Sequence, residues 1–206
     1  VAYGSLLHER RRTLHARVVE AIERLHADRL DDHVDKLAYH ALRGELWDRA
    51  VALSRRAGTV AATRIAYPNA VACYEQALAA LRRLPKDLER RQEAADLHFE
   101  LARSLYAAGL LDRAMDTYRD AEKLAVTLGD DHRVARVCTG LAYLLGSEAD
   151  HHGSIEAGER ALLLAARVAD PALQIWTSVG WPVSTSPSGP ISEVSSGPVP
   201  RWTRSR

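Results

Sequence analysis

The stretch Ala70-Val-Ala-Cys73-Tyr74-Glu-Gln-Ala77-Leu78 decides the fold class. Two small residues, Ala70 and Ala77, stand seven positions apart, and the aromatic Tyr74 follows the first of them by four positions. Residues at spacings of three, four and seven lie on one face of an α-helix. Small side chains on that face let a second helix approach closely, so the stretch predicts tightly paired helices.

The same pattern occurs twice more. The copies consist of Ala114, Tyr118 and Ala121, and of Ser154, Gly158 and Ala161, where glycine replaces the aromatic residue. Upstream of each copy lie the matching positions of a preceding helix, which are Ala57 and Gly58, then Leu101, Ala102 and Leu105, then Leu141, Ala142 and Leu145. We expect these residues to pack between helices and not to contact a ligand.

A further segment, Trp176-Thr-Ser-Val179-Gly180, resembles the W-x-x-L-G opening of a tetratricopeptide repeat. The chain resembles this family from about Leu37 to Gly180. The resemblance implies an all-α solenoid of antiparallel helix pairs, wound as a right-handed superhelix with a concave binding surface. The copies stand 44 and 40 residues apart, whereas the family repeat has about 34. Longer units of this kind are similar to those in the sensor arms of large bacterial signalling ATPases.

Glycine, proline and aspartate divide the sequence into expected helices, because aspartate caps helix starts and glycine ends helices. The first expected helix starts at about Leu6. The second runs from Asp31 or Asp32 to Gly44, the third from about Glu45 to Arg64, the fourth from Pro68 to before Pro85, and the fifth from near Asp87 to Gly109. The sixth ends at Gly129, the seventh runs from after Asp130–Asp131 to near Gly146, the eighth starts near Ser154, and the ninth starts at Asp170–Pro171. In the first helix, one apolar face comprises Leu7, Leu14, Val18, Ile22 and Leu25.

The N-terminal region carries a second resemblance. The stretches Val1–His15 and Leu37–Val51 resemble the segments that follow the winged-helix part of STAND-type signalling ATPases, some of which are fused to a class III adenylate/guanylate cyclase or to a DNA-binding domain. Because the chain opens at Val1, we interpret it as a fragment of such a protein. The expected organisation is an N-terminal helical junction at 1–44, tetratricopeptide-like repeats at 45–180 and a tail at 181–206.

The tail has a different composition from the helices. It contains no alanine or leucine and holds five of the eight prolines, at positions 182, 187, 190, 198 and 200. Such a composition predicts disorder. The change comes directly after Gly180, within the first helix of a repeat, so we favour a frame-shifted or artificial end; a genuine flexible linker is the alternative.

Charge and composition argue against several classes of function. The 28 basic and 27 acidic residues nearly balance, whereas nucleic-acid binders usually have a basic excess. No apolar run is long enough to span a membrane and no signal peptide is visible, so we expect a cytoplasmic protein that does not enter a membrane. Cys73 and Cys138 lie far apart and are expected to be buried hydrophobic residues.

No residue pattern predicts catalysis. His8 with His15, and His33 with His40, are separated by seven residues and lack the convergence of a zinc site, while His151 is expected in a solvated loop beside His152. Arg10-Arg11-Arg12 reads as a solvated helix face. Phosphate-binding loops and nucleophile motifs are absent from the sequence. We therefore expect no enzyme activity, no nucleotide hydrolysis and no cofactor.

The sequence supports a regulatory protein-interaction scaffold from an ATP-binding signal-transduction protein. Its expected partner is another protein or the ATPase domain upstream of it. Two alternatives stay open. The repeats could sense a small-molecule effector in the concave groove, or the parent protein could be a nucleotide cyclase whose catalytic domain lies elsewhere.

Overall fold

The computed structural model describes the backbone of residues 2–171 and 173–175 and the side chains from Leu7 onward. Every regular element in these residues is a helix, which confirms the all-α prediction. The elements are α1 (Ala2–Leu25), the 3-10 turn η1 (Leu30–Asp32), α2 (Val34–Arg43), α3 (Trp47–Thr63), α4 (Tyr67–Leu81), α5 (Leu88–Ala107), α6 (Leu111–Leu128), α7 (Asp131–Ser147) and α8 (His151–Val168). The predicted tail at 181–206 and Trp176 lie outside the described residues.

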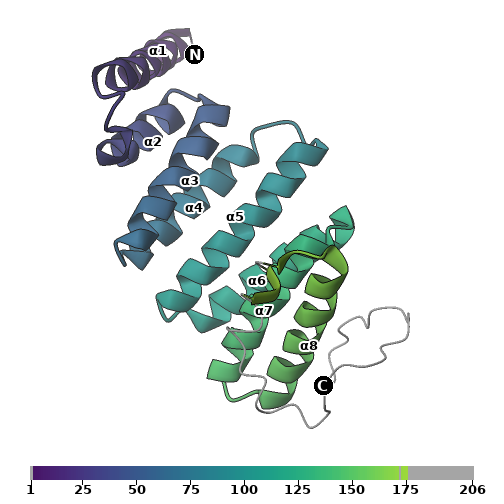
Figure 1. Ribbon diagram of the computed structural model, residues 1–206. Coiled ribbons are helices and arrows are strands. Elements are labelled where there is room, and N and C mark those ends of the chain that lie inside the picture. The colour runs from purple at the N-terminus through teal and green to yellow at the C-terminus, as the bar shows by residue number, and fades with distance from the viewer. Residues whose placement is uncertain (1, 172, 176–206) are drawn as a thin grey trace.

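The helices pack in the order in which they follow one another along the chain. The closest partners are α3 with α4, α5 with α6, and α7 with α8, and each pair also contacts the next one. Figure 1 shows these antiparallel pairs as a stack, with α1 at one end and α8 at the other. The predicted sequential packing of helix pairs is therefore confirmed.

Aspartate side chains start the later helices as the sequence predicts. Asp87, Asp130 and Asp150 each accept a hydrogen bond from the backbone N–H three residues ahead, at 2.8, 2.9 and 2.9 Å. Asp170 accepts one from the N–H of Leu173 at 3.1 Å, which confirms the predicted cap at that position. These carboxylates satisfy backbone donors that have no partner within the helix.

Three predicted helix starts are wrong. Asp31 and Asp32 belong to η1 and do not cap α2, whose preceding residue is His33. The third helix begins at Trp47 and not at Glu45, because Glu45 adopts a φ of 53° and cannot continue a right-handed helix.

The third error concerns His151 and His152, which the sequence places in a loop before a helix that starts near Ser154. Both histidines are exposed, but they form the first turn of α8. The reason is that Asp150 caps the helix through the N–H of Gly153, so the helix begins three residues earlier than expected.

The apolar face predicted for α1 points mainly to solvent. Leu7, Leu14 and Leu25 are 47%, 59% and 70% exposed, whereas Val19, on another side of the helix, is fully buried. The side that docks instead contains Ala16, whose backbone lies so close to Gly44 that a Cβ on Gly44 would come within 3.1 Å of the Ala16 nitrogen. Close backbone contact, and not the leucine face, fixes α1 to α2.

Tyrosine rings fill the space between helices where glycine leaves room. The ring of Tyr74 on α4 lies against Gly58 on α3, and a Cβ on Gly58 would come within 2.7 Å of it. The ring of Tyr118 on α6 lies against Gly140 on α7, where a Cβ would come within 2.5 Å. Tyr74 therefore closes a helix pair, whereas Tyr118 joins one pair to the next.

We predict that Gly140→Ala lowers the free energy of unfolding by about 1–3 kcal/mol, because the new methyl group overlaps the Tyr118 ring and forces it to move. Gly146→Ala is the matched control on the same helix, since its Cβ meets only the Ser154 hydroxyl at 3.3 Å. Thermal melts compare the two variants. Equal midpoints would contradict the close contact between Tyr118 and Gly140.

Candidate functional site

The residues predicted to pack between helices are buried. Of the predicted packing residues that the structure describes, Leu145 is partly buried and the others are buried, among them Ala70, Tyr74, Ala77, Leu101, Ala102, Ala114, Tyr118, Ala121, Leu141, Ala142 and Ala161. Trp176, the remaining predicted packing residue, lies outside the described part of the chain. Since these side chains are covered by neighbouring helices, any contact with a partner has to come from other residues.

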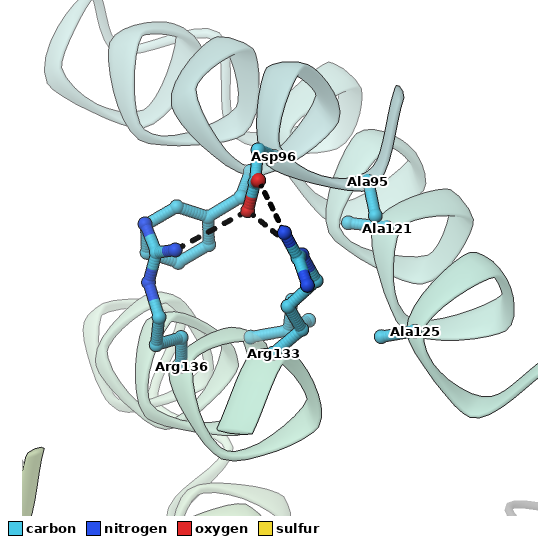
Figure 2. A pocket seen from close by; sticks show the side chains of 8 residues that line it. Ala95, Asp96, Ala121, Ala125, Arg133 and Arg136 are labelled. Atoms are coloured by element: carbon cyan, nitrogen blue, oxygen red, sulfur yellow. Dashed lines mark hydrogen bonds and ion pairs between the residues drawn. The ribbon is translucent and has the colours of Figure 1, made fainter. Parts of the chain in front are cut away.

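A group of charged residues lies between α5 and α7. Asp96 on α5 accepts two hydrogen bonds from the guanidinium group of Arg133, at 3.0 and 2.8 Å, and a third from Arg136 at 3.3 Å. Figure 2 shows both arginines of α7 reaching up to this one carboxylate. Arg133 also donates to Asp130 at 2.5 Å, so its position is fixed from two sides.

Phe99 lies next to this group. The guanidinium carbon of Arg136 lies 4.4 Å from the centre of the Phe99 ring, a distance suited to a cation–π interaction. Arg103, one turn further along α5, approaches the same ring at 5.9 Å. Arg103 is exposed and forms no ion pair with any residue that the structure describes. Its guanidinium group is therefore free to bind a carboxylate from outside.

The charged contacts continue from α5 to α3. Arg55 on α3 donates to both oxygens of Glu100 on α5, at 3.3 and 2.6 Å. These hydrogen bonds raise the pKa of Arg55, so the group stays charged throughout the accessible range of pH. Helices α3, α5 and α7 thus share one polar side, which we call the α3–α5–α7 surface and define by Arg55, Asp96, Glu100, Arg103, Arg133, Arg136 and Tyr143.

Tyr143 is included in this surface by its position on α7. It follows Arg136 by seven residues, which places the two side chains on the same face of the helix. The Tyr143 side chain is 42% exposed, unlike the buried Tyr118. Exposed tyrosine and arginine side chains are enriched in protein-binding surfaces.

The space beside Asp96 is small. The recess lined by Asp96, Phe99, Arg133, Arg136 and small residues of α5, α6 and α7 leaves no room for even a water molecule (Figure 2). Pockets for small organic ligands usually measure about 300–1,000 Å³. The polar groups beside Asp96 are also paired with one another, so this recess does not indicate a binding site for a metabolite.

The histidines lie in pairs that the sequence did not indicate. His8 with His15 and His33 with His40 are separated by seven residues in the sequence, whereas the structure brings together His15 and His40, whose Nδ1 atoms are 2.7 Å apart. His26 and His33 stack with their ring centres 4.0 Å apart. Within the described residues, no three histidine, cysteine or acidic side chains gather as metal ligands.

The two cysteines are free and chemically protected. Cys138 is buried, and this burial raises the pKa of its thiol to about 12. Cys73 is half-buried, which differs from the full burial expected from the sequence, and its pKa is also raised by burial. A raised pKa keeps the thiol protonated and therefore a poor nucleophile.

None of the helices that the structure describes is both long enough and apolar enough to cross a bilayer. No protein-family model matches the chain, and no curated protein is significantly similar to it. The described residues form an all-helical stack of antiparallel helix pairs.

We predict that Asp96→Asn destabilises the fold by about 1–3 kcal/mol, because the partly buried Arg136 loses its carboxylate and Arg133 keeps only that of Asp130. Glu75→Gln is the matched control, since Glu75 pairs with Arg113 across exposed side chains and such pairs contribute about 0–1 kcal/mol. Urea titrations measure both variants. A larger loss in the control would show that the Asp96 group is not a structural support.

We also predict that acid loosens α1 from α2. Burial, together with the charge of His15, lowers the pKa of His40, so the docked state favours neutral histidine. Below about pH 6.5, the undocked chain therefore binds more protons than the docked chain. The contribution of His40 to docking is complete above this pH and is lost as the pH falls below it. Hydrogen exchange of the α1 amides, corrected for intrinsic rates, measures the change between pH 7.5 and 5.5.

The control for this experiment is His15→Gln, which removes one ring of the pair while leaving the neighbouring Tyr39 and the Arg12–Glu45 ion pair in place. Its α1 amides are expected to respond less to pH than those of the unmodified chain. An identical response in both proteins would mean that the His15–His40 pair does not control docking.

Proposed function

We propose that this chain is a protein-interaction module of tetratricopeptide type, which binds a segment of a protein partner on the α3–α5–α7 surface. The observation that carries this proposal is the position of Arg103, an exposed cation beside Phe99 on a surface whose other charges are paired. A carboxylate on the partner would find its counter-ion there, and Tyr143 would offer apolar contact area.

Two features support the finer assignment to tetratricopeptide-like repeats. Small residues recur where the paired helices approach closely, and a tyrosine from the second helix of a pair fills the gap left by glycine. Repeats of this kind stack into a right-handed superhelix whose first helices line a concave side. In this chain α3, α5 and α7 hold the position of first helices, so the proposed binding surface would be that concave side.

The cellular role that we propose is regulation within a larger ATP-binding signalling protein. The resemblance of the N-terminal region to STAND-type ATPases supports this role, and it makes the upstream ATPase domain or a separate protein the partner. A nucleotide-cyclase parent remains an alternative of the same kind, with catalysis outside this chain. A small-molecule effector is less well supported, because the recess next to Asp96 has no room for even a water molecule, whereas ligand pockets usually measure about 300–1,000 Å³.

Selection of peptides from a random phage-displayed library on the purified chain tests the proposal. We expect enriched peptides to contain acidic residues and to bind at least tenfold more weakly to the double variant Arg103→Glu/Tyr143→Ala, because it reverses the free charge and removes the exposed ring. Fluorescence anisotropy with labelled peptides measures the affinities.

The matched control is Arg119→Glu/Val126→Ala, which makes similar changes at exposed positions of α6. Its affinity is expected to stay within about twofold of the original. Failure to enrich any peptide, or equal loss in both double variants, would refute binding on the α3–α5–α7 surface.

A further inference from the structure

Helix α1 has two different faces, and only one of them is used within the chain. The inner face docks on the rest of the protein through Arg12 with Glu45 at 3.1 Å, through Glu23 with Arg49 at 3.5 Å, and through the buried Val19. This face is largely polar. Of the apolar side chains of α1, Val19 and the partly buried Ile22 pack against the core, whereas the three exposed leucines do not contribute to docking.

The outer face carries those apolar side chains. At 100° per residue, Leu7, Leu14, Val18 and Leu25 fall within about 40° of arc on the side opposite Arg12 and Glu23. The three leucines are 47%, 59% and 70% exposed. We call these four residues the leucine stripe. An isolated exposed leucine needs no explanation, but leucines aligned along a helix over several turns form a continuous apolar surface.

Arginines border the leucine stripe on both sides. Arg10, Arg17 and Arg24 follow one edge at intervals of seven residues, and Arg11 lies on the other edge. All four are exposed, and none forms an ion pair with the residues whose positions are described. In contrast, Arg12 on the inner face is paired. The outer face is thus apolar along its centre and positively charged along its edges.

The arrangement identifies the chemistry of what would cover this face. Leucines spaced by seven residues match a partner helix whose own apolar residues repeat with the same period, as in a coiled coil. The arginines at the edges require carboxylates at the flanking positions of that helix. Figure 1 shows α1 at one end of the stack, so a helix placed there would extend the succession of packed helices.

Other occupants fit the outer face less well. A second copy of α1 would bring two sets of arginines together, and like charges in contact are unfavourable. A lipid surface is usually bound by a helix whose polar face is in water and rich in Lys and Arg, whereas the polar face of α1 is docked on the chain through Arg12 and Glu23. Nucleic acid would pair with the arginines but would leave the leucines exposed to water.

We propose that the outer face of α1 is a second interaction surface, which binds an acidic amphipathic helix of a protein partner. The partner helix lays its apolar side on the leucine stripe, and its glutamate or aspartate side chains pair with the four arginines. This proposal is independent of the α3–α5–α7 surface, because none of its residues belongs to that surface.

The test uses the whole chain and a synthetic helical peptide of three heptads, with leucine at the apolar positions and glutamate at the flanking ones. Fluorescence anisotropy of the labelled peptide gives the affinity. We expect saturable binding that weakens as the ionic strength increases, because exposed charges are screened by salt. The same peptide with lysine in place of glutamate is expected not to bind.

Two double variants locate the binding. Leu7→Gln/Leu14→Gln and Arg10→Glu/Arg17→Glu are each expected to weaken binding at least tenfold. The matched control is Leu88→Gln/Arg91→Glu, since Leu88 on α5 is also a largely exposed leucine and Arg91 an exposed arginine; it is expected to bind normally. Because the altered side chains are exposed, circular dichroism should show unchanged helix content in all variants.

Three results would overturn the proposal. The first is an acidic peptide that does not bind, or that binds all variants equally. The second is binding to phosphatidylserine vesicles or duplex DNA, in the absence of peptide binding, that depends on the same leucines and arginines. The third is self-association in sedimentation experiments that Leu7→Gln/Leu14→Gln abolishes, since a second copy would then be the occupant.

Discussion

The fold depends on how closely the backbones of adjacent helices approach one another. Alanine occupies the positions of closest contact, and Gly58 and Gly140 provide the space in which the Tyr74 and Tyr118 rings lie. A helix surface made of small residues gains little from the burial of each side chain, so stability has to come from many close contacts along the pair. The two tyrosine rings fill these spaces both within a pair, where Tyr74 lies against Gly58, and between pairs, where Tyr118 lies against Gly140.

Arginine–carboxylate pairs connect helices that are not neighbours in sequence. Arg55 with Glu100 joins α3 to α5, Asp96 with Arg133 joins α5 to α7, and on the other helices of the pairs Arg113 with Glu75 joins α4 to α6. The partly buried pairs on the α3–α5–α7 surface are better supported by hydrogen bonds than the exposed pair between α4 and α6. A surface whose charges are held in place needs little rearrangement when a partner binds, which reduces the entropic cost of association.

The sequence predicts the helix pairs well because the relevant information is local. Ala70, Tyr74 and Ala77 lie within two turns, and the aspartate caps act three residues ahead, so spacing alone is informative. The charged site could not be found in this way. Asp96 and Arg133 are 37 residues apart, and in a chain with 28 basic and 27 acidic residues nothing marks these two as partners. The docking side of α1 was predicted only in part: a leucine face normally indicates the core, but Leu7, Leu14 and Leu25 are exposed, and the helix is held by polar contacts, by the buried Val19 and by Ile22.

Sequential packing also determines how the chain is expected to fold. Most contacts join a helix to the next one along the chain, so forming them closes only short loops and costs little chain entropy. Low contact order of this kind is associated with rapid folding. Nucleation can take place in any helix pair and spread in both directions, since each pair presents the surface on which its neighbour folds. During synthesis, completed pairs could therefore become structured before the later helices have emerged, and the stack would grow from α1 towards α8.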